Sequence, residues 1–216
     1  MNLDHPVTRI GFAIQANIPV VWVGERGRGK STVLLGLAPM LGLHGVDINA
    51  TYLLAEDIGG IPVKGKDGCV ERQFDRWIKT ICVEPSLLFV DEVGRFTGAA
   101  ARNVMLRTLQ ERKVADQPMH AGTRIVMAMN PPSTDADTRP LPAAFANRCA
   151  FEYAEVPASD RRDFRLGGPG ALAHFAKLDA AEFDKQLPVG MNMMADFLDL
   201  RPALESADVE KDPIAQ

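Results

Sequence analysis

This sequence lacks the cysteine pattern of a metal site or of a disulfide framework. Its three cysteines, Cys69, Cys82 and Cys149, have no C-x-x-C spacing, and an odd number of thiols does not suggest a set of paired disulfides. We therefore expect free thiols in a reducing cytoplasm.

It also lacks long apolar runs and a strong excess of charge of one sign. No uncharged apolar stretch is long enough to cross a bilayer, and the N-terminal residues do not have the basic and then apolar pattern of a signal peptide. The 24 Lys and Arg residues face 28 Asp and Glu residues, for a net charge of −4. This balance gives no general attraction to nucleic acids or anionic membranes. We expect a cytoplasmic protein that makes no membrane contact.

The sequence does contain short apolar runs that alternate with helix-length segments. Its 216 residues predict one domain, or one domain with a small appendage. Continuous or alternating apolar runs predict strands at 18–24, 45–54, 86–92, 123–130 and 149–157. Helical patterns cover 30–40 and 98–114. Together they predict an α/β fold, a parallel sheet with helices on both faces.

Two other segments have a less regular composition. Residues 57–70 are rich in glycine and charge, which predicts either a loop or a small hairpin that turns at 66–68. Residues 165–174 have the Gly and Pro content of a linker, and helix-like pieces follow at about 170–186 and 190–206 before a polar tail. We expect a core domain over 1–157 and a partial helical lid with the tail over 158–216.

The strongest motif is GERGRGKS, residues 24–31, between an apolar strand and a helix. It matches the phosphate-binding pattern G-x-x-x-x-G-K-[ST] in full and in the required context. Glycines let backbone N–H groups converge on phosphate oxygens, and the helix directs its positive end at the same point. We expect Lys30 to contact the β- and γ-phosphates and Ser31 to ligate Mg²⁺. The predicted nucleotide-binding residues are Gly24, Glu25, Arg26, Gly27, Arg28, Gly29, Lys30, Ser31 and Thr32.

Polar residues follow the later strands at positions suited to phosphate chemistry. Asp91 ends the buried run LLFVD and can hold Mg²⁺ beside Ser31, while Glu92 can act as general base towards a water molecule. Asn130 ends the next strand and can help to position that water; alone, it is also compatible with an ordinary turn before Pro131. Arg148 could stabilise developing phosphoryl charge, because its planar guanidinium makes bidentate contacts; taken alone, it fits a surface arginine better.

Together these motifs resemble those of the AAA+ ATPases, most closely the MoxR-like branch. GERGRGKS resembles Walker A, LLFVDE resembles Walker B, VMAMNPP resembles sensor 1, and LPAAFANRCAFEY resembles the segment that carries the arginine finger. The resemblance implies a P-loop NTPase fold with a five-stranded parallel sheet and a small helical lid. It also implies a ring, often a hexamer, with ATP and Mg²⁺ between subunits.

The resemblance further implies roles for single residues. Asp91 would be the Mg²⁺ partner, Glu92 the catalytic base, Asn130 sensor 1, and Arg148 the finger that acts on a neighbour's ATP. It places the adenine pocket near residues 7–18 and suggests that 57–70 is the helix-2 insert of this branch, a hairpin often facing the ring pore. A protein with a von Willebrand factor A domain is the expected partner.

The sequence departs from the family at several positions. Glu25, Arg26 and Arg28 stand where small residues or proline are usual, and Cys149 stands where phenylalanine is usual. We find no convincing sensor 2 arginine; Arg201 is a poor candidate because it lies in a helix that precedes the usual segment. This motivates an alternative, a nucleotide-gated assembly module with little turnover of its own. A nucleic-acid motor is less favoured by the net charge, and a small-molecule kinase fits the motif order poorly.

Overall fold

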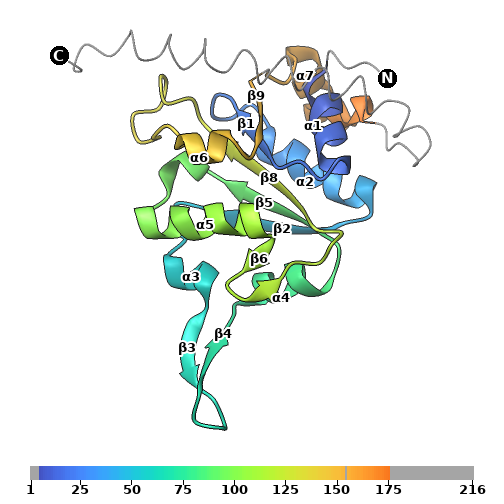
Figure 1. Ribbon diagram of the computed structural model, residues 1–216. Helices are drawn as coiled ribbons and strands as arrows, with labels where there is room; N and C mark the ends of the chain where they lie inside the picture. Colours follow the sequence, from blue (N-terminus) through green and yellow to red (C-terminus); the bar gives the residue numbers. More distant parts are fainter. Residues whose placement is uncertain (1–4, 154, 176–216) are drawn as a thin grey trace, which may run out of the picture. The chain divides into compact units, whose positions relative to one another are not determined.

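The computed structural model describes residues 5–153 and 155–175, which belong to one compact unit. Its centre is a five-stranded sheet in the order β2-β5-β8-β1-β9, in which every neighbouring pair is parallel (Figure 1). The strands are β1 (Val20–Val23), β2 (His44–Asn49), β5 (Ser86–Asp91), β8 (Arg124–Met129) and β9 (Ala150–Glu152). The predicted α/β fold is therefore confirmed.

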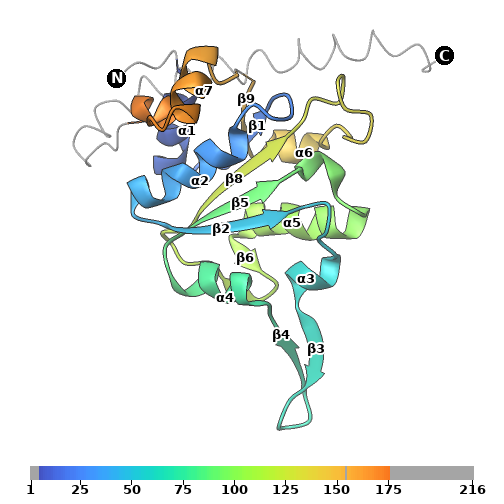
Figure 2. The same cartoon turned by 180° about the vertical axis from the view of Figure 1, so that it is seen from behind.

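Helices cover both faces of this sheet, as Figures 1 and 2 show. On one face, α4 and α5 contribute Ile78, Ile81, Met105 and Leu109 to a cluster with alternate residues of the strands. On the other face, α1 and α2 contact the strands. The bounds are α1 (Pro6–Gln15), α2 (Lys30–Leu41), α3 (Ala55–Gly59), α4 (Arg76–Val83), α5 (Ala99–Glu111), α6 (Ala143–Ala146) and α7 (Ala158–Arg165), with 3₁₀ helices η1 (Val93–Arg95) and η2 (Gly170–His174).

Burial on both faces explains why the strands have continuous apolar runs. All four residues of β1 and the first five of β5 are buried, and so are five of the six residues of β8. An all-parallel sheet needs apolar side chains on both sides because helices cover both. Among residues 5–153 and 155–175, every helix is too short or too polar to cross a membrane.

The segment between α3 and α4 forms an antiparallel hairpin that projects from the sheet (Figure 1). Its strands are β3 (Ile61–Lys64) and β4 (Val70–Gln73), and Gly68, with a φ of 83°, lies in the turn. Of the two alternatives for 57–70, the hairpin is confirmed for its larger part, although residues 57–59 belong to α3. A second, two-residue hairpin joins β6 (Lys113–Val114) to β7 (Gln117–Pro118).

Several predicted elements extend beyond the observed ends of the strands and helices. The strand predicted at 45–54 ends at Asn49, whose side-chain oxygen accepts a hydrogen bond from the N–H of Thr51 and starts a turn. The strand predicted at 149–157 ends at Glu152, because the sheet edge at β9 pairs over three residues only. The helix predicted at 98–114 ends at Glu111, because Arg112 takes a left-handed conformation with a φ of 54°.

The region beyond residue 157 also differs from the prediction. Residues 158–165 form α7, which was not predicted, and 170–174 form η2 instead of a linker or the start of a longer helix. Gly170, with a φ of 54°, is incompatible with the first turn of an α-helix. The rest of the predicted lid, including 190–206 and Arg201, lies outside the described residues. The boundary at 157 stays a prediction.

Candidate nucleotide-binding site

The loop of residues 24–29 connects β1 to α2 at the carboxyl end of the sheet. Gly27 and Gly29 have φ values of 75° and 84°, a left-handed conformation that glycine adopts at little cost. Gly29 is the N-cap of α2 and offers no side chain to the first N–H groups of the helix. These groups and the positive end of the helix dipole therefore remain available for an anion.

Lys30 is the first residue of α2, and its ammonium group turns back onto the loop. Nζ donates hydrogen bonds to the carbonyl oxygens of Gly24 at 2.5 Å and Glu25 at 2.9 Å, and to Oδ1 of Asn130 at 3.3 Å. The side chain is only 8% exposed, and burial lowers the pKa of Lys30. The structure thus joins the predicted phosphate-binding lysine to the predicted sensor 1 residue.

Ser31 and Asp91 meet although sixty positions separate them in the sequence. The Ser31 hydroxyl donates to Oδ2 of Asp91 at 2.9 Å. Asp91 ends β5, and β8 lies between β5 and β1 in the sheet, so both residues lie at the carboxyl edge with Asn130 between them. A hydroxyl and a carboxylate that already touch can share one oxygen-seeking divalent cation such as Mg²⁺.

Glu92 follows Asp91 in a left-handed conformation, with a φ of 54°. This conformation is uncommon outside glycine and concentrates at functional sites. Its carboxylate accepts a hydrogen bond from the Thr51 hydroxyl at 2.8 Å, and its side chain is 25% exposed. The carboxylate is therefore held in place while one side remains open to solvent.

Two residues that the sequence analysis did not single out, Arg95 and Asp135, complete the network around Asn130. The Asn130 amide donates to Oδ2 of Asp135 at 2.7 Å. Nη2 of Arg95 lies 2.6 and 2.7 Å from the two Asp135 oxygens, and Nη1 lies 3.6 Å from Glu92. The Arg95 and Asn130 hydrogen bonds hold the pKa of Asp135 at about 2. The sequence offers one signal for these two residues, which is their closeness along the chain to predicted site residues. Arg95 follows Glu92 by three positions, and Asp135 follows Asn130 by five.

The three charged residues that are unusual in the loop fall into two groups. Arg28 pairs with Glu25, with Nη2 at 2.5 Å from Oε2, and lies 3.5 Å from Glu155. Arg26 is 68% exposed and places its guanidinium 3.8 Å from Glu92 and 3.7 Å from Asp135. Arg26 therefore faces the predicted catalytic side chains, whereas Arg28 is engaged at the other side of the loop.

Arg148 lies away from this network, beside α5 and α6. Its guanidinium donates to the carbonyl of Ala144 at 2.7 Å and to Gln110 at 2.9 Å. Of the predicted site residues, the structure brings together Lys30, Ser31, Asp91, Glu92 and Asn130, and it leaves Arg148 outside. Its role stays a prediction.

A cavity of about 100 Å³ lies beside the loop, and Gly27, Arg28 and Gly29 form part of its lining. Its lining includes Thr32 and Val33 of α2, Val156, and Phe164 of α7. Residues 7–18, which were predicted to supply the adenine pocket, form α1 and the turn after it, and most of the α1 side chains are buried. The cavity beside the loop is instead lined by the loop, α2 and the segment 156–172.

Comparison with known proteins assigns no family to this chain. No family model and no curated protein matches this sequence. Among solved structures, a "putative ATPase" from Cytophaga hutchinsonii aligns with a TM-score of 0.47 at 19% identity. The alignment covers 90% of this chain, which spans only 56% of the length of that protein.

The fold assignment rests on this chain's own sheet and loop. Five parallel strands lie between helical layers, and the strand-to-helix loop with the GERGRGKS sequence opens at their carboxyl edge. The carboxylate of Asp91, at the end of a second strand, accepts a hydrogen bond from Ser31 at the start of the helix that follows the loop. This arrangement is that of a P-loop NTPase fold.

Proposed function

We propose that this chain binds and hydrolyses ATP. The observation that carries the proposal is the convergence of five side chains from the start of α2 and the ends of β5 and β8: Lys30, Ser31, Asp91, Glu92 and Asn130. The loop N–H groups and the start of α2 would hold the phosphates. The cavity lined by Thr32, Val33, Val156 and Phe164 would receive the nucleoside.

Each side chain has a separate task in the proposed reaction. Lys30 would exchange the loop carbonyls for the β- and γ-phosphate oxygens, and Ser31 and Asp91 would hold Mg²⁺, which supplies charge neutralisation when bound. Glu92 would take a proton from the attacking water, and Asn130 would orient that water. The oxygen of the water bonds to the γ-phosphorus, the bond to the β–γ bridging oxygen breaks, and ADP and phosphate leave.

We further propose that the chain works in a ring of the AAA+ type, as a MoxR-like remodeller of a protein partner. Arg148 supports this proposal by its position, because its distance from the chain's own network suits a residue that acts on the ATP of a neighbour. A protein with a von Willebrand factor A domain is the proposed partner. The hexamer and the cytoplasmic location are part of the same proposal.

Nucleotide binding can be tested separately from turnover. We expect the wild-type chain with Mg²⁺ to bind a fluorescent ATP analogue, and Lys30→Ala to weaken binding by about 10- to 100-fold, because one charge-assisted contact is lost. Lys79→Ala is the matched control, since Lys79 is an exposed lysine on α4. Equal affinity in the Lys30 and Lys79 variants would contradict the assigned site.

A further inference from the structure

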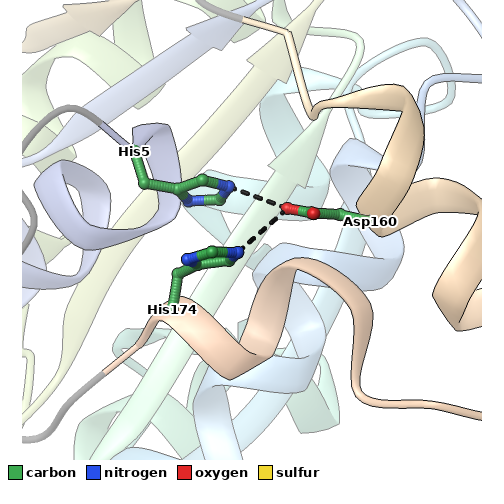
Figure 3. Close-up of side chains that lie close together, drawn as sticks. All are labelled: His5, Asp160 and His174. Atoms are coloured by element: carbon green, nitrogen blue, oxygen red, sulfur yellow. Dashed lines mark hydrogen bonds and ion pairs between the residues drawn. The ribbon is translucent and has the colours of Figure 1, made fainter.

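Three side chains that are far apart in the sequence converge on one point outside the nucleotide site. His5 is the N-cap of α1, Asp160 lies in the first turn of α7, and His174 ends η2. Nε2 of His5 lies 2.9 Å and Nε2 of His174 lies 3.3 Å from the same oxygen, Oδ2 of Asp160 (Figure 3). The two imidazole rings stack with centroids 3.9 Å apart.

We propose that His5, Asp160 and His174 form a binding site for a divalent transition-metal ion, with zinc as the ion best suited to it. The ligand atoms that these residues offer all lie within 4.8 Å of one another. Two imidazoles and a carboxylate are a common zinc ligand set, with bonds of about 2.0–2.2 Å. Ligand atoms that share one ion through bonds of this length lie about 4 Å or less from one another. Only small side-chain shifts are therefore needed to bring the three ligand atoms around one ion.

The surroundings favour a built site over a chance meeting of surface groups. His5 is 7% exposed and Asp160 is 12% exposed, while His174, at 39%, leaves one side open for entry of an ion and a water ligand. The Ser159 hydroxyl donates to Oδ1 of Asp160 at 3.1 Å, which orients the carboxylate from outside the cluster. The hydroxyl of Thr8 donates to the carbonyl of His174 at 2.9 Å and fixes the backbone of η2 against α1.

Metal binding has one clear structural consequence. In the absence of metal, Nδ1 of His5 accepts a hydrogen bond from the N–H of Val7 at 3.3 Å, so the ring proton lies on Nε2 and points at Asp160. Coordination through Nε2 moves that proton to Nδ1 and breaks the contact with Val7. The Val7 amide therefore reports on occupancy.

The site would stabilise the wall of the cavity beside the phosphate-binding loop. Asp160 itself lines that cavity, together with Arg161, Phe164 and residues of η2. A metal ion would add a direct link between the start of α1, α7 and η2, which also meet through the buried side chains of Ala171 and Phe175. Zinc binding itself does not require ATP hydrolysis, because none of the three residues belongs to the network around Lys30 and Glu92, although Asp160 lines the cavity proposed for the nucleoside.

The test is zinc titration of the full chain after treatment with a chelator, under reducing conditions and with excess Mg²⁺ to occupy oxygen-ligand sites. We expect one zinc ion per chain, a rise in melting temperature, a shifted Val7 amide resonance, and visible absorption typical of tetrahedral geometry when Co²⁺ replaces zinc. His174→Ala and Asp160→Asn should each weaken binding by more than about 100-fold, because loss of a residue that only orients a metal ligand already costs about 10–100-fold.

Two control variants exclude other donors. His44→Ala removes an exposed histidine on β2, and Cys69→Ser removes an exposed thiol, so both should bind zinc like the wild type. Circular dichroism checks that His174→Ala and Asp160→Asn remain folded. The proposal is overturned if the wild type does not bind zinc, or if the folded His174 and Asp160 variants bind it with unchanged affinity. The cluster would then be a set of structural contacts that joins α1, α7 and η2.

Discussion

Asp135 connects the residues around the predicted γ-phosphate position without belonging to any of the recognised motifs. It accepts one hydrogen bond from Asn130 and two short contacts from Arg95, and its side chain is only 16% exposed. Because Asp135 accepts a hydrogen bond from the NH₂ group of Asn130, the side-chain oxygen of Asn130 faces Lys30. We therefore regard Asp135 as a positioning residue for the proposed reaction.

The substitution Asp135→Asn should slow turnover more than it weakens nucleotide binding. The amide cannot form the charged contact with Arg95, and its NH₂ group can face the NH₂ group of Asn130, which frees Asn130 to rotate. We expect kcat to fall by roughly 10-fold or more and KM to change little, as for loss of positioning. Asp137→Asn is the control, because the side chain of Asp137 is 84% exposed and lies 3.7 Å from Arg95, outside hydrogen-bond distance. A purely raised KM would contradict this role.

Asp135 also predicts a pH dependence of stability. Its pKa is lowered from 3.8 to about 2, mainly by the hydrogen bond from Arg95 and then by that from Asn130. The ionised group is therefore favoured in the folded state, and its stabilisation is complete above the unfolded value and lost as the pH falls towards the folded value. Urea denaturation of the wild type and of Asp135→Asn measures the difference in their free energies of unfolding. This difference should be constant above about pH 3.8 and should shrink as the pH falls below that value. A difference that stays constant through this interval would refute the assignment.

At the scale of elements, α6 places Arg148 by burying one aromatic side chain. Phe145 is fully buried in the cluster beneath α5, and Arg148 follows at the end of the helix, bound to Ala144 and Gln110. The four-residue helix has little stability of its own, because short helices depend on tertiary packing. The position of Arg148 therefore depends on Phe145.

We predict that Phe145→Ala destabilises the chain by about 3–5 kcal/mol, the usual cost of removing a buried aromatic side chain. Phe164→Ala, which truncates a phenylalanine that is 49% exposed on α7, should cost about 1 kcal/mol or less. Chemical denaturation measures both values. Similar costs for the two variants would show that α6 is not held by Phe145.

The sequence predicts best those elements whose local pattern and tertiary environment agree. β1, β5 and β8 were found because burial on both faces demands continuous apolar runs. The helix α7 was missed because ASDRRDFR is strongly polar and none of its residues is buried, so it has no apolar periodicity. The Arg95–Asp135 contact was missed because it joins residues forty positions apart, and that pairing is created only by the fold.

At the scale of the whole molecule, ring assembly can be tested by mixing inactive subunits. Glu92→Gln lacks the base but keeps Arg148, and Arg148→Ala keeps the base but lacks the proposed finger. If ATP lies between subunits, mixed rings contain interfaces with both groups intact, and about a quarter of the wild-type rate should return when the two variants assemble at random. No recovery in mixtures that do assemble and bind ATP would contradict a finger supplied by the neighbour.

The dependence of turnover on protein concentration separates the two leading forms of the proposal. A remodelling ATPase whose site is completed by a neighbour should show a specific rate that rises as subunits associate. A nucleotide-gated assembly module should bind ATP with a flat rate near zero. Light scattering alongside the rate measurement shows whether association occurs over the same range. Binding to DNA or RNA that weakens with salt would instead favour a nucleic-acid motor.

The most direct test of the central claim compares phosphate release by the wild type and Glu92→Gln in the presence of Mg²⁺. Glu56→Gln, an exposed glutamate on α3, is the matched control. We predict that Glu92→Gln retains ATP binding and loses turnover by roughly 100-fold or more, because a general base contributes about 10²–10⁴. Unchanged phosphate release by the Glu92 variant would contradict the assignment of this site as an ATPase centre.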